Sequence, residues 1–422
     1  MIVLVVILGV DSMAHGQYVR TCGGASPLTP VSGTGVFFSV TPSLCVSERY
    51  DSNVFYAPPT PGLQRDDFVT NVNPMLRVNH NGDYASGILN VGGFSETYVK
   101  NPDLNYLGTR DSLFLNLDKS IKRLFPNASL IVMDTFNYTP LPPGYDNPVA
   151  GTSPSDPVNT QDVFAQGLLF RRVNNLSNNG TVSTSYATTA LTRLHASYTH
   201  SMIHFQVGAP LTTGGLNLFN TTTQTGMVGG AAQMSELDTL QINYSHAQID
   251  YTRDPISSSF KIDSVIPGWS RTLTPNLKAE VGGGVIKITP GITTYAANAA
   301  LIMNFLNNSA TISYSHTAFP SYMAVVPTIM VGDVFLLSAV HKIGRQWQLS
   351  ETGSYAHRSG GSGINSVTYT TYRAGADLYY WVNSIWSTGL SYEYSNFSSD
   401  AGTSNTSFDR QVITLSVRAT WE

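Results

Sequence analysis

Apolar and polar residues alternate with a period of two in the last stretch of the chain, residues 411–421. Strict alternation over ten or more residues predicts a β-strand with one apolar face and one polar face. The strand runs to the end of the sequence and stops on an aromatic, which is typical of the closing strand of a membrane-spanning β-barrel. The predicted apolar, barrel-closing face consists of Ile413, Leu415, Val417, Ala419 and Trp421.

Alternating stretches recur along most of the chain, for example at 68–79, 84–98 and 128–138. From residue 181 onward, strands of roughly 11–15 residues are joined alternately by very short turns and by longer loops, as at the two ends of an outer-membrane barrel. We therefore predict an all-β fold, a transmembrane antiparallel up-and-down barrel of about 16–18 strands. The number stays open because 36–56 and 260–273 are irregular. With an even number of strands, the first strand would begin and the last strand would end on the short-turn side.

Composition supports a barrel over soluble domains or a helical bundle. Charged residues make up 12% of the chain, and the mean hydropathy is −0.04. This charged share is about half of that in an ordinary soluble domain. Low charge with middling hydropathy results when apolar lipid-facing residues alternate with uncharged polar ones. The net charge of −4 argues against a nucleic-acid partner.

The chain divides into three predicted regions. The apolar run at 2–10 is too short to span a bilayer as a helix, and small residues follow it, so 1–16 resembles a secretory signal peptide. A short N-terminal strand is the alternative for this run. Residues 17–35 are rich in Gly, Ser and Pro and predict a flexible periplasmic N-terminus. The barrel then covers 36–422, with a long extracellular loop near 139–179.

A Tyr-x-His pattern repeats late in several predicted strands. In its first three copies the tyrosine, the histidine and the apolar residues share one parity, so all are expected to face lipid. A metal or catalytic role would need a pocket, and this parity argues against it. The tyrosines instead predict an interfacial aromatic girdle formed by Tyr198, Tyr244, Tyr314 and Tyr355.

Charged residues of both signs fall on the polar parity and should line the lumen. A charge on the lipid face would cost up to about 2–4 kcal/mol at the midplane, so inward placement is expected. These charges either set a field across a water-filled lumen or pair with each other along the wall. Glu351 has the outward parity, and a nearby bulge would turn it inward. The candidate lumen-lining charges are Asp118, Lys278, Glu280, Arg373, Asp377, Glu393 and Arg418.

Enzymatic signatures are absent from the sequence, so no catalytic residue, cofactor or metal site is predicted. The chain has no nucleophile elbow, P-loop, HExxH or dinucleotide fingerprint. A Ser/His hydrolase site on the wall remains a minor alternative. The glycines in 281–285 lie within a strand and suggest close strand contact or bending. Cys22 and Cys45 are either a periplasmic disulfide or two free thiols.

Short segments of the chain resemble β-barrel porin families of bacterial outer membranes, especially those encoded with exopolysaccharide systems. The resemblance rests on ERYDSNVF at 48–55, TYVKNP at 97–102, LTPN at 273–276 and the C-terminal strand. It implies an outer-membrane channel without catalytic residues. One departure is Glu422, because such chains usually end on the aromatic residue itself.

The predicted function is therefore passive or facilitated diffusion of small polar solutes across a bacterial outer membrane. One alternative, which comes only from the resemblance, is an exit duct for a secreted polysaccharide. Another is a non-conducting structural or adhesive barrel that is plugged by its long loop. The expected partners are outer-membrane lipids and the barrel-assembly machinery, with a homo-oligomer also possible.

Overall fold

The computed structural model describes residues 37–59, 61–139, 174–206, 217–253, 256–321, 323–324, 327–361, 366–401 and 404–421. The predicted signal peptide and N-terminal region lie outside these residues. Two short helices, η2 (Pro102–Leu104) and α1 (Asp118–Ile121), and a small pair of strands, β8 (Asn217–Leu218) and β15 (Met323–Ala324), accompany the main sheet. The strands of that sheet are β1 (Phe37–Asp51), β2 (Asp67–Asn81), β3 (Ser86–Tyr98), β4 (Tyr106–Asn116), β5 (Ala128–Thr139), β6 (Asn175–Ala187), β7 (Thr192–Phe205), β9 (Asn220–Gln233), β10 (Asp238–Arg253), β11 (Ile256–Thr274), β12 (Leu277–Thr289), β13 (Thr293–Asn304), β14 (Asn308–Ser321), β16 (Thr328–Ile343), β17 (Trp347–Gly360), β18 (Val367–Trp381), β19 (Trp386–Ala401) and β20 (Ser404–Thr420).

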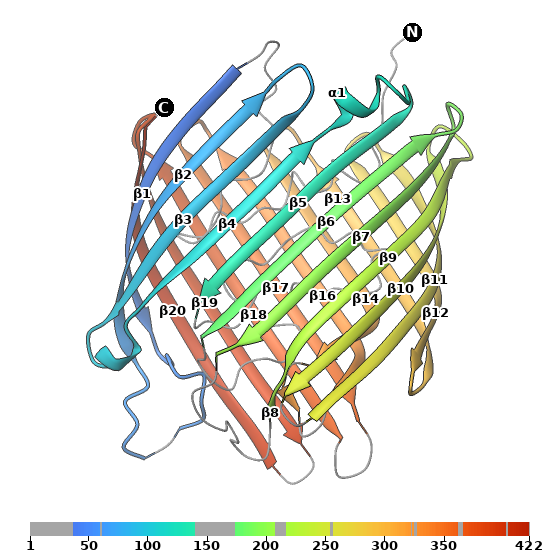
Figure 1. Ribbon diagram of the computed structural model, residues 1–422. Coiled ribbons are helices and arrows are strands. Elements are labelled where there is room, and N and C mark those ends of the chain that lie inside the picture. The colour runs from blue at the N-terminus through green and yellow to red at the C-terminus, as the bar shows by residue number, and fades with distance from the viewer. Residues whose placement is uncertain are drawn as a thin grey trace.

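These eighteen strands form one closed antiparallel barrel (Figure 1). Each strand pairs with its neighbours in the chain, and β1 also pairs with β20, from Ser43↔Thr420 to Asp51↔Val412. On its other side β20 pairs with β19. Closure gives each of the eighteen strands a paired neighbour on both sides, which is the condition for a sheet to stand in lipid. The predicted barrel and the closing role of the last strand are confirmed.

The closing strand shows the predicted separation of its two faces. Ile413, Leu415 and Val417 point outward and are 46%, 57% and 46% exposed, and Trp421 beyond the strand is also exposed. Ala419 shares their parity but is buried. The residues between them, such as Thr414, lie on the inner face.

A proline explains one of the two stretches that looked irregular in the sequence, 260–273. Proline has no N–H to donate to a strand ladder. The pairing of β11 with β12 skips from Val265↔Val285 to Gly268↔Gly282, on either side of Pro267. Nevertheless β11 is one continuous strand, so the count is eighteen rather than sixteen.

The two ends of the barrel differ as the loop lengths predict. β1 begins and β20 ends at the same end as α1, where the turns are short, and the longer connections lie at the opposite end (Figure 1). We refer to the two as the short-turn end and the long-loop end. The long loop expected at 139–179 is shorter than predicted, because β6 already begins at Asn175. Residues 140–173 lie outside the described part of the chain.

The outer face of the barrel is apolar over most of its height. Exposed Val, Leu, Ile and aromatic side chains occur on strands all around the barrel, a surface far larger than a soluble protein presents to water. A wall of this kind is expected to contact lipid. Among these outward side chains are Val40, Leu44, Val91, Leu107, Val182, Leu194, Val228, Ile242, Val281, Ile312, Leu337 and Leu390.

All four girdle tyrosines lie on this outer face. Tyr314 and Tyr355 belong to a row of aromatic rings that crosses four neighbouring strands through Phe335 and ends at Tyr372. The successive ring centroids are 4.8, 6.1 and 5.0 Å apart. Their role at a membrane interface stays a prediction.

In the described part of the chain, no helix has the length and apolar character needed to cross a bilayer.

Substitutions at two glycines of β12 can test how closely β11 and β12 approach each other. A Cβ added at Gly284 would lie 1.9 Å from the carbonyl oxygen of Val265, so Gly284→Ala should force the two strands apart. We expect a loss of about 1–3 kcal/mol in the free energy of unfolding, measured by urea unfolding in detergent micelles. At the adjacent Gly283, the nearest atom to an added Cβ is 3.7 Å away, so Gly283→Ala is the matched control. Equal stability of the two variants would contradict this packing.

Candidate functional site

Charged side chains gather on the inner wall where β1 meets β20. They alternate in sign along neighbouring strands and lie towards the long-loop end, since Asp51 is the last residue of β1. We call this set the seam charge chain. Its members, in order around the wall from β3 to β18, are Glu96, Arg49, Asp51, Arg410, Glu393 and Arg373.

The first part of the chain joins β1 to β3. Arg49 reaches past β2 and donates from its two terminal nitrogens to the two oxygens of Glu96, each at 3.0 Å. The Tyr98 hydroxyl also donates to Glu96, at 2.5 Å. Arg49 Nε lies 3.9 Å from Asp51 Oδ2, which continues the chain towards the seam. Such two-point contacts between guanidinium and carboxylate are among the stronger and more directional polar contacts in proteins.

The second part of the chain crosses the seam itself. Arg410 of β20 is fully buried and donates to both oxygens of Asp51, from Nε at 2.9 Å and from Nη2 at 2.5 Å. Its Nη1 lies 3.8 Å from Glu393, which in turn accepts a 2.8 Å hydrogen bond from Arg373. The Tyr56 ring lies 4.8 Å from the Arg410 guanidinium carbon. Side-chain contacts therefore reinforce the backbone ladder that closes the barrel.

The loop between β1 and β2 folds inward over this chain. Asn53, Val54 and Tyr56 are each at most 2% exposed, which is unusual for a loop. The Asn53 amide donates to the carbonyl oxygen of Ala57 at 2.9 Å. Tyr56 adopts a positive φ of 53°, a conformation that non-glycine residues seldom take. The surrounding packing holds this conformation in place, and the loop therefore covers the seam charge chain.

A second contact ties the first residue of β2 to the loop between β3 and β4. The buried Asp67 carboxylate accepts hydrogen bonds from the backbone N–H groups of Lys100 and Asn101, at 2.8 and 2.9 Å. Beside it, Asp66 forms an exposed ion pair with the Lys100 ammonium. The hydrogen bond from Lys100 lowers the pKa of Asp66, and the same bond raises the pKa of Lys100.

The predicted lumen charges fall into two groups. Arg373 and Glu393 belong to the seam charge chain, and Lys278 pairs with Glu280 at 2.7 Å on β12. These contacts favour wall pairing for those four residues. The parity of their strands places Asp377 and Arg418 on the inner face, the second of them without an ion pair among the described residues.

Asp118 and Glu351 do not lie where the sequence suggested. Asp118 opens α1 at the short-turn end instead of continuing a strand, and its carboxylate accepts the backbone N–H of Leu130 at 2.9 Å. Glu351 stays outward, because the pairing of β17 with both neighbours is regular and contains no bulge. It lies 3.7 Å from His341. Cys45 is disulfide-bonded, and Cys22 lies outside the described residues.

Arg49, Asp51, Glu96 and Arg410 were missing from the predicted set. Each has the inward parity of its strand, so period-two counting could have found them. Arg49 and Asp51 lie in the ERYDSNVF segment at 48–55, which predicted a family resemblance and no lumen position. Nothing in the sequence shows that Asp51 and Arg410, far apart in the chain, meet at the seam.

The tip of the β14–β16 hairpin narrows the barrel from within. β14 stops pairing with β13 at Ala297↔His316 but stays paired with β16 as far as Ser321↔Thr328. From His316 to Ser321 both faces of β14 are buried. Ala318 and Ile329 pack against inward-facing side chains of β10–β13 such as Ile262, in one apolar cluster. The hairpin tip therefore leaves the wall and lies over its inner face.

Two further contacts hold this hairpin. Tyr251 of β10 donates to the carbonyl oxygen of Thr328 at 2.9 Å. On the other face of the hairpin, the Phe319 ring lies 3.5 Å from the guanidinium carbon of the buried Arg358. The short β8 and β15 pair with each other, so the β7–β9 and β14–β16 connections meet at the long-loop end.

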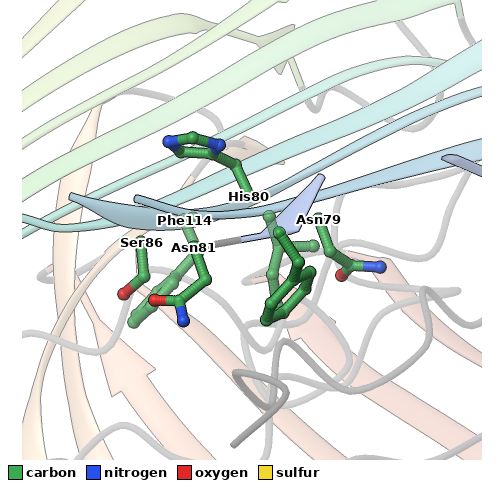
Figure 2. A pocket seen from close by; sticks show the side chains of 8 residues that line it. Asn79, His80, Asn81, Ser86 and Phe114 are labelled. Carbon is green, nitrogen blue, oxygen red and sulfur yellow. The ribbon is translucent and has the colours of Figure 1, made fainter. Parts of the chain in front are cut away.

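A small pocket lies at the short-turn end between β1, β2, β3 and β4 (Figure 2). Asn79, Asn81, Ser86 and Phe114 point to one side of the sheet, and His80 points to the other. The residues on the pocket side offer amides, a hydroxyl and a ring, without a base beside a nucleophile. The pocket gives no support to a hydrolase site.

Comparisons with solved structures find proteins of Pseudomonas aeruginosa, among them an outer membrane protein and a siderophore receptor. OpdK, an outer membrane protein of Pseudomonas aeruginosa, is 10% identical with a TM-score of 0.46, and the match covers 91% of this chain and 99% of that one. OccK3 (OpdO) of the same organism is 13% identical with a TM-score of 0.42, over 91% and 96%. The siderophore receptor PirA of Pseudomonas aeruginosa is 9% identical with a TM-score of 0.41, and the match covers 91% of this chain and 80% of that one. No family model matches the chain, and no curated protein does.

The buried contact between Asp51 and Arg410 predicts that Asp51→Asn destabilises the protein far more than Asp66→Asn. Asp51→Asn should leave the buried Arg410 guanidinium with Glu393, 3.8 Å away, as its remaining carboxylate and lower the free energy of unfolding by about 3 kcal/mol. Asp66→Asn removes a carboxylate from an exposed pair and should leave the urea midpoint nearly unchanged. The measurement is urea unfolding of both variants in the same detergent. A small effect of Asp51→Asn would show that the seam does not depend on this contact.

Proposed function

We propose that the protein is a porin-like channel of a bacterial outer membrane, through which small polar solutes diffuse. The observation that carries the proposal is the separation of faces in a closed barrel of eighteen strands. The outer face is apolar, while the inner face carries Ser, Thr, Asn and charged side chains. A polar lining behind an apolar wall suits a water-filled path. The resemblance in sequence supports the same function, and no enzymatic activity is proposed.

The inward-folded hairpin supports a narrowed path rather than a wide pore. It places apolar side chains over one part of the wall, while the charges lie on the opposite part around the seam. Solutes would then pass a constriction with one apolar side and one charged side. Most charges of the seam are paired, so we expect weak selectivity, set by inward charges without an ion partner. Arg418 is such a charge among the described residues.

Two alternatives remain as proposals of lower rank. An exit duct for a secreted polysaccharide rests on the family resemblance alone. A plugged, non-conducting barrel gains some support from the inward-folded hairpin, and it makes a different electrical prediction. Insertion by the barrel-assembly machinery and formation of a homo-oligomer stay expectations.

Conductance in planar bilayers tests the proposal. The purified protein should give discrete conductance steps, and Arg418→Glu should shift the reversal potential in a salt gradient towards cation preference. The matched control is Lys261→Glu, an equal charge change on the outer face of β11, which should leave selectivity unchanged. Absence of conductance, both in the full chain and after deletion of 140–173, would contradict a channel. Equal shifts in both variants would remove Arg418 from the lumen lining.

A further inference from the structure

Three hairpins carry the same polar cluster on the outer face of the barrel. In each, an aspartate on one strand accepts two hydrogen-bonding contacts at Oδ1 from the preceding strand. One comes from a tyrosine hydroxyl, and the other from a histidine or asparagine two residues further along. We call these aspartates the aspartate belt: Asp263 with Tyr244 and His246 at 2.8 and 2.8 Å, Asp333 with Tyr314 and His316 at 2.7 and 2.9 Å, and Asp409 with Tyr394 and Asn396 at 2.9 and 2.6 Å.

The three aspartates occupy similar places in their hairpins. All three hairpins, β10–β11, β14–β16 and β19–β20, are closed at the long-loop end. The register also repeats, because each aspartate lies directly opposite the second residue of its pair: His246↔Asp263, His316↔Asp333 and Asn396↔Asp409. Towards the barrel middle, the same outer face continues with apolar side chains such as Ile242 and Ile312. The belt therefore marks the edge of the apolar band.

This position explains how carboxylates can occur on an otherwise apolar face. An ionised carboxylate in hydrocarbon is costly, whereas the headgroup layer supplies water, cations and phosphate groups. The side chains of Asp263 and Asp333 are 38% and 36% exposed. Both donors of each cluster use Oδ1, so the belt presents three Oδ2 atoms that accept no hydrogen bond from a described residue.

We propose that the belt binds divalent cations that bridge the protein to phosphate groups of the surrounding lipid leaflet. Mg²⁺ and Ca²⁺ prefer oxygen ligands and keep several positions for ligands from outside the protein. Nowhere in the described part of the chain do three or more His, Cys, Asp or Glu side chains group closely enough to hold a metal ion. Each belt aspartate supplies only part of a coordination shell, and lipid phosphate oxygens complete it.

The chemistry distinguishes this contact from direct phosphate binding. A carboxylate repels a phosphate at close range unless a cation lies between them. Lys or Arg side chains would bind phosphate directly, and among the described residues only Asp263 has one opposite it, Lys287 of β12. The inference rests on the membrane placement in the proposed function but not on conduction. It therefore needs a measurement that is independent of solute passage.

The test compares thermal unfolding of the full chain in vesicles of phosphatidylcholine and in vesicles that also contain phosphatidic acid. Each sample is measured with Mg²⁺ and with a chelator. The midpoint of the wild type should rise with Mg²⁺ by roughly 2–4 °C only where phosphatidic acid is present. In the variant Asp263→Asn/Asp333→Asn/Asp409→Asn the rise should disappear. Asparagine keeps an acceptor for the tyrosine and histidine, so the barrel should still fold.

Glu351→Gln is the matched control, because Glu351 is an outward, exposed carboxylate towards the short-turn end. It should keep the full Mg²⁺ effect when phosphatidic acid is present only in the leaflet at the long-loop end. The same rise in the triple variant, or a rise without phosphatidic acid, would overturn the proposal. Conductance of the triple variant should equal that of the wild type. Absence of conductance in the wild type, together with an intact Mg²⁺ effect in the wild type, would count against the channel function and not against the belt.

Discussion

Closure of the sheet is the constraint on which the rest of this structure depends. A wall that faces hydrocarbon cannot leave backbone N–H or C=O groups unpaired, because lipid offers no partner for them. The pairing of β1 with β20 meets this condition from Ser43↔Thr420 to Asp51↔Val412. It also brings the two ends of the described chain together, so every other strand is fixed in order and direction between them.

The seam carries more than backbone hydrogen bonds. Asp51 and Arg410 meet there as a buried, two-point ion pair, and neighbouring charges extend the contact around the wall. An ion pair of this kind contributes little net stability compared with an apolar pair, but breaking it is costly. Its main effect is on register, because a shift of β20 by one residue would turn Arg410 to the outer face. The same charges lie under the folded-in loop and shape the mouth of the lumen.

Much of the fold follows from period-two alternation alone. Strand positions, the apolar outer face of β20, the two unlike ends and the outward tyrosines could all be predicted, because parity fixes which face a residue occupies. The position of each residue along the barrel axis could not be predicted. Parity does not say which inward residues of different strands lie at the same level. The seam charge chain was therefore missed, although Arg373 and Glu393 were predicted to face the lumen.

Other errors have local causes. Asp118 has strand parity, but the chain turns into α1 after β4 ends at Asn116. Pro267 interrupts a ladder without ending its strand, which made β11 look irregular. The inward fold of the β14–β16 tip depends on apolar contacts with β10–β13, which no local pattern reveals. What passes through the barrel depends on these features of the lumen rather than on the alternation that forms the wall.

The register of the seam can be tested directly by cross-linking. With Cys22 and Cys45 replaced by serine, the pair Ser47→Cys and Ser416→Cys should form a disulfide, because these residues lie opposite each other on β1 and β20. The cross-linked barrel should keep its folded gel mobility at higher temperature than the reduced form. The offset pair Ser43→Cys and Ser416→Cys should not cross-link. A disulfide in the offset pair, or none in the facing pair, would contradict the closed barrel with this register.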